Sequence, residues 1–294
     1  FSAGAMDRFH QSMSWKFPTE SGKHESNSNR GKTSEQSKGW EASWHAERVT
    51  HGEPDSHAAS GLPLGVAVGR SFFLPLHYTA SYQYPLIVWF HSNGFNENQV
   101  DDVFPHISVR NYVGIGIRGT RAADSNGHRF DWHFSAAGIA SAHESTCEAV
   151  EEAMRRFSIH PSRIVLAGYR EGGTMAQRIA LRDPERFAGV ISLGGRIPQG
   201  GMGNLLQLRR RRLPMLWQWG QDNPQYNEEN LKTDCRLIMS LGAELEIRQY
   251  PDDDEMNTSA LGDVDAWIMR RIVAGSSIAD SEQWASSPIA YSRN

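Results

Sequence analysis

The chain has 294 residues, a formal net charge of −4 and 39% hydrophobic residues. This length suits one α/β domain of about 200 residues with polar tails. The acidic balance argues against an overall nucleic-acid-binding or basic membrane-surface protein, and no run of about 18 apolar residues predicts a transmembrane helix.

The two ends of the chain are polar and lack apolar periodicity. Residues 1–5 precede Met6 and are interpreted as a cloning remnant. The residues that follow, up to about residue 60, are rich in Ser, Gly, Glu, Lys, His and Asn, and this composition predicts a disordered tail over residues 1–60. Residues 276–294 are predicted to form a flexible C-terminal tail, which leaves residues 61–275 as the folded domain.

Between the tails, short apolar runs rich in β-branched and aromatic residues alternate with stretches of helical apolar spacing. Such runs suit strands buried on both faces of a sheet. Their alternation with helices predicts a three-layer α/β/α sandwich with a mostly parallel sheet, whose ligand site lies beyond the carboxyl ends of the strands. Strands are predicted over residues 66–76, 85–91, 112–117, 164–167, 189–193, 213–219 and 245–250, and helices over residues 137–157, 173–181, 227–241 and 259–274.

The segment from residue 164 to residue 176 carries the strongest motif of the chain. An apolar strand runs into a turn with Gly168 two residues before Arg170 and Gly172 two residues after it, and small residues then open a helix. This is the pattern of a nucleophile elbow, where small neighbours allow a sharp turn and the central side chain stands clear of the sheet.

Residues 84–273 resemble the phospholipase/carboxylesterase branch of the α/β-hydrolase superfamily, including dienelactone-hydrolase-like esterases. The resemblance covers about two-thirds of the chain, excludes both tails and implies the α/β-hydrolase fold. It implies four functional segments: a strand and oxyanion loop at residues 85–95, the elbow at 158–173, the acid loop at 220–222 and the histidine loop at 250–256.

The family's catalytic triad of serine, acid and histidine is degenerate in this chain. The resemblance aligns the serine with Arg170 and the histidine with Asp254, whereas Asp222 keeps the acid identity. A guanidinium has no nucleophilic lone pair and stays protonated. All twelve histidines lie at or before His160, although the family's histidine follows the elbow along the chain. We expect Arg170 to form an ion-pair network with Asp222 and Asp254 instead.

The predicted oxyanion loop and its surroundings also depart from the family. Ser92 stands where the family usually has glycine, and Glu171 places an anion near the position where negative charge would have to be stabilised. Trp132 is expected either to line a pocket or to pack simply, and His91 is expected to have a structural, hydrogen-bonded role. The residues assigned to the loop and pocket are His91, Ser92, Asn93, Gly94, Phe95, Glu171 and Trp132.

These substitutions favour a catalytically inactive, esterase-like protein that acts through binding. Its ligand is either a small molecule, anionic if it meets Arg170, or a protein partner. One alternative is a hydrolase with a rearranged, non-serine site in which Asp222 and Asp254 act with water. Another is an assembly or scaffold protein that binds through its tails.

No cofactor and no metal site are predicted. The acidic run at residues 252–255 could bind a divalent cation together with Asp222, but a solvated loop is the favoured interpretation. Cys147 and Cys235 are expected to be buried free thiols of a cytoplasmic protein, although one disulfide between them is possible.

Overall fold

The computed structural model describes residues 69–200, 203–223, 227–251 and 256–275. The predicted tails at residues 1–60 and 276–294 lie outside these residues, as does Asp254, and their assignments stay predictions. Among the described residues no helix is long and apolar enough to cross a bilayer.

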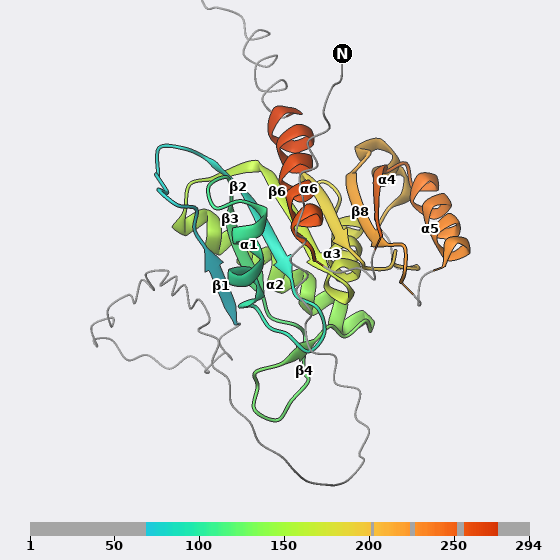
Figure 1. Cartoon of the computed structure of the whole chain (residues 1–294), viewed down its shortest axis with the longest axis horizontal. Helices are drawn as coiled ribbons and strands as arrows, with labels where there is room; N and C mark the ends of the chain where they lie inside the picture. The colour runs from blue at the N-terminus through green and yellow to red at the C-terminus, as the bar shows by residue number, and fades with distance from the viewer. Residues whose placement is uncertain (1–68, 201–202, 224–226, 252–255, 276–294) are drawn as a thin grey trace, which may run out of the picture. The chain divides into compact units, whose positions relative to one another are not determined.

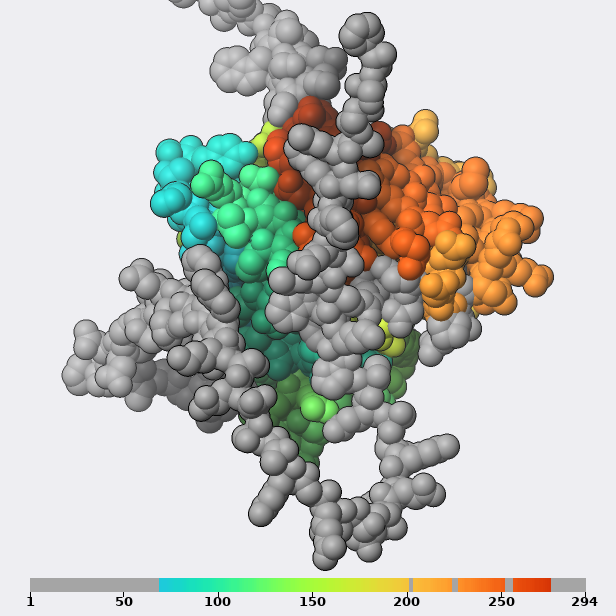
Figure 2. Space-filling model, in the orientation of Figure 1, coloured from blue at the N-terminus to red at the C-terminus, as the bar shows by residue number. Residues whose placement is uncertain are grey.

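A seven-stranded sheet forms the centre of the fold, in the order β1-β3-β2-β6-β7-β8-β9. Only β1 runs antiparallel to its neighbour, and the other pairs are parallel. In Figure 2 the cyan residues near β1 and the orange residues near β9 lie at opposite ends, in agreement with this order. The strands are β1 Arg70–Phe73, β2 Tyr84–Phe90, β3 Val113–Ile117, β6 Ile159–Tyr169, β7 Gly189–Leu193, β8 Pro214–Gly220 and β9 Glu244–Tyr250, with a separate hairpin of β4 Arg121–Ala122 and β5 Phe130–Asp131.

Helices cover both faces of the sheet, as Figure 1 shows, so the predicted three-layer α/β/α arrangement is confirmed. The helices α4, α5 and α6 each begin at an asparagine whose side chain accepts a backbone N–H of the first turn, which is a favourable cap. The helices are α1 Gln99–Ile107, α2 Ala136–Arg156, α3 Glu171–Arg182, α4 Leu205–Arg211, α5 Glu228–Ser240 and α6 Thr258–Ile268, which continues into the π-helical turn η1 Met269–Val273.

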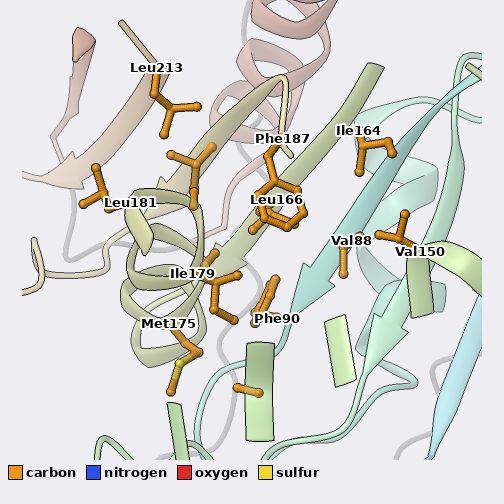
Figure 3. Packing of buried hydrophobic residues seen from close by; sticks show 14 of the residues in the cluster. Val88, Phe90, Val150, Ile164, Leu166, Met175, Ile179, Leu181, Phe187 and Leu213 are labelled. Carbon is orange, nitrogen blue, oxygen red and sulfur yellow. The ribbon is translucent and has the colours of Figure 1, made fainter. Parts of the chain in front are cut away.

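Strand β2 shows how the sheet holds the layers together. Every residue of β2 is buried, as expected for a strand between two layers of helices. Val88 and Phe90 belong to the core cluster that contains α2 and α3 residues (Figure 3). On the opposite face the Trp89 ring lies 6.4 Å from the Phe104 ring of α1. Alternate side chains of one strand therefore anchor helices on both faces.

Most predicted elements are confirmed, but two strands have bounds other than those predicted, and two helices and the β4–β5 hairpin were not predicted. The strand predicted over residues 66–76 is observed only as β1, and β6 begins five residues before the predicted start at residue 164. Helices α1 and α4 were not predicted. The two cysteines are free thiols, but both are half-buried rather than buried.

Candidate functional site

The turn between β6 and α3 has the geometry of an elbow with Arg170 at its apex. Arg170 has φ 49° and ψ −117°, a region that non-glycine residues rarely adopt. Two backbone hydrogen bonds hold the turn: the Arg170 N–H donates to the Leu193 carbonyl at 2.7 Å, and the Arg170 carbonyl accepts from the Thr174 N–H at 3.0 Å. The sheet and the helix together therefore maintain the strained conformation.

The glycines on either side of Arg170 are required by close backbone contacts. A Cβ on Gly172 would lie 2.1 Å from the Phe90 carbonyl oxygen at the end of β2. A Cβ on Gly168 would lie 2.6 Å from the Gly172 carbonyl carbon. The predicted elbow pattern thus reflects a turn packed so tightly against the sheet that no side chain fits at either position.

The Arg170 guanidinium lies over the ring of Tyr169, with its central carbon 5.1 Å from the ring centroid. The residue is half-buried, and Asp222 is exposed. Between these two described side chains no ion pair within 4.0 Å is present. The prediction of an Arg170–Asp222 ion pair is therefore wrong, and its Asp254 counterpart falls outside the described residues.

The loop of residues 91–95 follows β2 and lies next to the elbow. The Asn93 N–H donates to Oε2 of Glu171 at 3.4 Å. The Gly94 N–H is shared between the Phe130 carbonyl at 3.0 Å and Oδ1 of Asp131 at 3.1 Å. Two backbone donors of the loop are thus bound to acceptors of the chain itself, and two of the three acceptors are carboxylates.

His91 holds this loop in place through two hydrogen bonds of its ring. Its Nδ1 donates to the Ser92 carbonyl at 2.7 Å, and its Nε2 accepts from the Gly119 N–H at 2.9 Å. These partners select the neutral tautomer with the proton on Nδ1. Burial lowers the pKa of His91 to about 4, an effect that the hydrogen bond to Ser92 and the nearby carboxylates of Glu97 and Asp131 only partly oppose. His91 therefore has the structural, hydrogen-bonded role that was predicted.

Trp132 binds the loop through both its side chain and its backbone. Its side chain is buried, its Nε1 donates to the His91 carbonyl at 2.6 Å, and its backbone N–H donates to Oδ1 of Asn93 at 3.0 Å. Phe95 pairs with Phe130 in an isolated bridge, and Ser92 is buried. The described contacts of Trp132 favour packing and hydrogen bonding over lining a pocket.

Two charged residues near the loop were missed by sequence reasoning. Oδ2 of Asp131 accepts from Arg121 at 2.8 Å, which holds the Asp131 carboxylate beside Gly94. The only sequence signal for Asp131 is its position next to Trp132.

Among the described residues no group of three or more His, Cys, Asp or Glu side chains could hold a metal ion, and the acidic run at residues 252–255 falls outside them.

An ion pair between the half-buried Arg118 and the buried Glu97 lies just before the start of α1. Nε of Arg118 donates to both carboxylate oxygens of Glu97, at 3.1 and 3.0 Å, and the Arg118 guanidinium lies over the Phe130 ring. Burial raises the pKa of Glu97, but the hydrogen bonds from Arg118 and from the Glu97 backbone outweigh it and hold that pKa below its usual value. Glu97 is therefore a structural anion.

The elbow lies within the part of the chain that is similar to a known protein family. Residues 124–270, half of the chain, match the model of the phospholipase/carboxylesterase family. The matched region contains the elbow but not the loop of residues 91–95.

One curated relative is lysophospholipase-like protein 1 from Mus musculus, 31% identical over 118 residues, which are 39% of this chain and 49% of the relative. The chain thus spans about half the length of the curated relatives it matches. A Bacillus cereus carboxylesterase structure has a TM-score of 0.56 at 14% identity, covering 70% of this chain and 95% of its own. YahD, solved with malic acid, has a TM-score of 0.54 at 15% identity, covering 69% of this chain and 99% of its own. At these identities the structures show a shared fold.

Proposed function

Because the chain belongs to the phospholipase/carboxylesterase family of α/β-hydrolases, we propose that it is a pseudo-esterase, which keeps the family's scaffold and acts through binding. The observation that carries this proposal is the arginine at the apex of the strained elbow. In the resemblance, this is the position of the serine nucleophile. A guanidinium has no nucleophilic lone pair with which to attack an ester carbonyl, and it stays protonated.

The backbone N–H groups of the 91–95 loop are already hydrogen-bonded within the chain, and this supports the same proposal. Acyl transfer needs backbone N–H groups aimed at the place where an oxyanion develops. Here the Asn93 N–H donates to Glu171, and the Gly94 N–H is bound by Phe130 and Asp131. A carboxylate beside these donors would repel a developing negative charge and raise the barrier to its formation.

The remaining triad positions are consistent with lost hydrolysis. We propose that Asp222 occupies the acid position and Asp254 the histidine position, as the resemblance implies. Among the described residues no contact favours the rearranged hydrolase or the scaffold alternative. A cytoplasmic location stays a prediction.

Covalent labelling tests the absence of an activated nucleophile. We expect the purified full chain to keep its unmodified mass after incubation with a fluorophosphonate, which reacts with activated serines and related nucleophiles. The Bacillus cereus carboxylesterase provides the enzyme control under the same conditions. A single adduct on a residue of the elbow or of the 91–95 loop, found by peptide mass spectrometry, would overturn the proposal.

A further inference from the structure

Strand β9 forms a long edge of the central sheet. It pairs with β8 on one side, and on its other side no strand of the described residues pairs with it. Edge strands are usually kept short, bulged or interrupted by proline or lysine, because their unpaired backbone groups invite a further strand. Strand β1, at the opposite edge, has four residues, whereas β9 has seven and contains neither proline nor lysine. Strand β9 is therefore the edge that is better able to accept another strand.

Two hydrogen bonds show which backbone groups of β9 face this open edge. The Glu244 N–H donates to the Leu213 carbonyl at 3.0 Å. The Tyr250 carbonyl accepts from the Gln221 N–H at 2.8 Å. The even-numbered residues of β9 thus bind towards β8, and in a parallel pair the residues between them direct their N–H and C=O groups to the other side. The residues whose backbone groups face the open edge are Leu245, Ile247 and Gln249.

The side chains of β9 place an acid and a base on either side of Ile247. Arg248 binds Oε1 of Glu246 at 3.0 Å, and Arg270 binds Oε2 of the same carboxylate at 2.7 Å. Arg248 also pairs with Asp263 of α6. The side chains of Arg248 and Glu246 are still 26% and 34% exposed, so each can meet a group across the edge. Ile247 points to the opposite face of the strand and is 40% exposed.

We propose that β9 pairs antiparallel with β9 of a second copy of this chain, with Ile247 opposite the partner's Ile247 on a two-fold axis. In this register Glu246 lies opposite the partner's Arg248, and Arg248 lies opposite the partner's Glu246. Opposite residues that are not bonded to each other through the backbone are the closest in an antiparallel pair, so unlike charges there stabilise it. The inference does not depend on the pseudo-esterase proposal.

The charge pattern selects both this register and this partner. A two-fold axis at Glu246 or at Arg248 would place that charge opposite itself, which destabilises a pair of strands. An axis two residues before the proposed one would oppose Glu244 with the partner's Glu246, and an axis two residues after it would pair only the end of the strand. An unrelated strand would have to supply the complementary charges in the correct order. A second copy supplies them by symmetry.

Sedimentation equilibrium of the full chain at about 1–100 μM tests the proposal, because this range covers weak but specific complexes. A monomer–dimer equilibrium is expected. Ile247→Pro should weaken the dimer about tenfold or more, because proline removes an N–H that faces the partner. The same change removes no hydrogen bond to β8, since the Ile247 backbone faces the open edge.

Two charge reversals test the register. Arg248→Glu and Glu246→Arg each place like charges opposite one another when a variant pairs with itself. Each variant alone should therefore dimerise about tenfold or more weakly than the unchanged chain. An equimolar mixture of the two variants restores unlike charges at both positions. The mixture is expected to form a heterodimer with an affinity close to that of the unchanged chain.

Two matched reversals on α2 provide the controls. Glu144→Arg and Arg155→Glu make the same changes of charge at exposed positions of a helix that packs against β2, β3 and β6. Neither should change the dimerisation constant, whether alone or in a mixture. Circular dichroism checks that every variant is folded. Recovery of the dimer in the mixture of β9 variants cannot arise from a loss of structure.

Three results would overturn the proposal. The first is a full chain that stays monomeric over the whole concentration range. The second is a dimer that Ile247→Pro leaves unchanged, which would place the interface elsewhere on the chain. The third is a mixture of Arg248→Glu and Glu246→Arg that associates no more strongly than either variant alone, which would exclude the register centred on Ile247.

Discussion

Gly172→Ala is expected to destabilise the folded domain by more than about 3 kcal/mol. A Cβ at this position would lie 2.1 Å from the Phe90 carbonyl oxygen and 2.3 Å from that of His91. Both atoms are backbone atoms at the end of the buried strand β2, so they cannot move aside as a flexible side chain could. Overpacking usually costs about 1–3 kcal/mol, and a clash with backbone exceeds that range.

Gly262→Ala is the matched control, because Gly262 also lies within a helix. It is exposed on α6, and a Cβ there would meet no atom within 4 Å. Removing a helical glycine from such a site should stabilise the domain by about 0.5–1 kcal/mol. Urea unfolding of both variants measures the difference. Similar stabilities for the two would contradict the tight packing of the elbow against β2.

The stability of the domain is expected to fall by about 2 kcal/mol between pH 7 and pH 4.5 because of His91 alone. Burial lowers the pKa of His91 from its usual 6.5 to about 4. Between these two values the unfolded chain binds a proton that the folded chain does not. Stability therefore decreases as the pH falls from about 6.5 towards 4, by about 1.4 kcal/mol for each unit of pKa difference.

His91→Gln isolates this contribution. Glutamine offers one donor and one acceptor, as the neutral imidazole does for Ser92 and Gly119, but does not titrate. Unfolding free energies from urea titrations at several pH values should show a slope between pH 6.5 and 4.5 that is reduced in the variant. Glu97 titrates in both proteins, so its contribution cancels in the difference. Equal slopes would show that His91 is not held neutral by burial.

The layer architecture could be predicted from sequence because it depends on local apolar patterns. Strand β7 begins and ends at the predicted residues, since all five of its residues are buried. Strand β6 extends back to Ile159, but its first part contains the exposed residues Pro161 and Ser162 and therefore carries no apolar signal. In α1 the buried residues Val100, Val103, Phe104 and Ile107 have helical spacing, yet two aspartates and Pro105 interrupt the apolar pattern.

The site was only partly predictable, for a different physical reason. The elbow could be located because its glycine spacing is a pattern within a short segment of the sequence, although Gly172 is required by its contact with Phe90 at the end of β2. The absence of an Arg170–Asp222 ion pair could not be predicted, since it depends on how two loops more than fifty residues apart meet in space. Glu171 was expected near the oxyanion position, and its carboxylate does lie on the Asn93 N–H. Asp131, by contrast, has no motif around it, and its contact with Gly94 is seen only in the structure.

Hydrolysis of p-nitrophenyl butyrate by the purified full chain, measured beside Arg170→Ala, tests the central claim most directly. The pseudo-esterase predicts that both proteins release p-nitrophenol at the rate of buffer alone, because neither has a nucleophile at the elbow. Saturable turnover by the chain that is lost in Arg170→Ala would contradict this account, and would mean that the scaffold hydrolyses esters without a serine at the elbow.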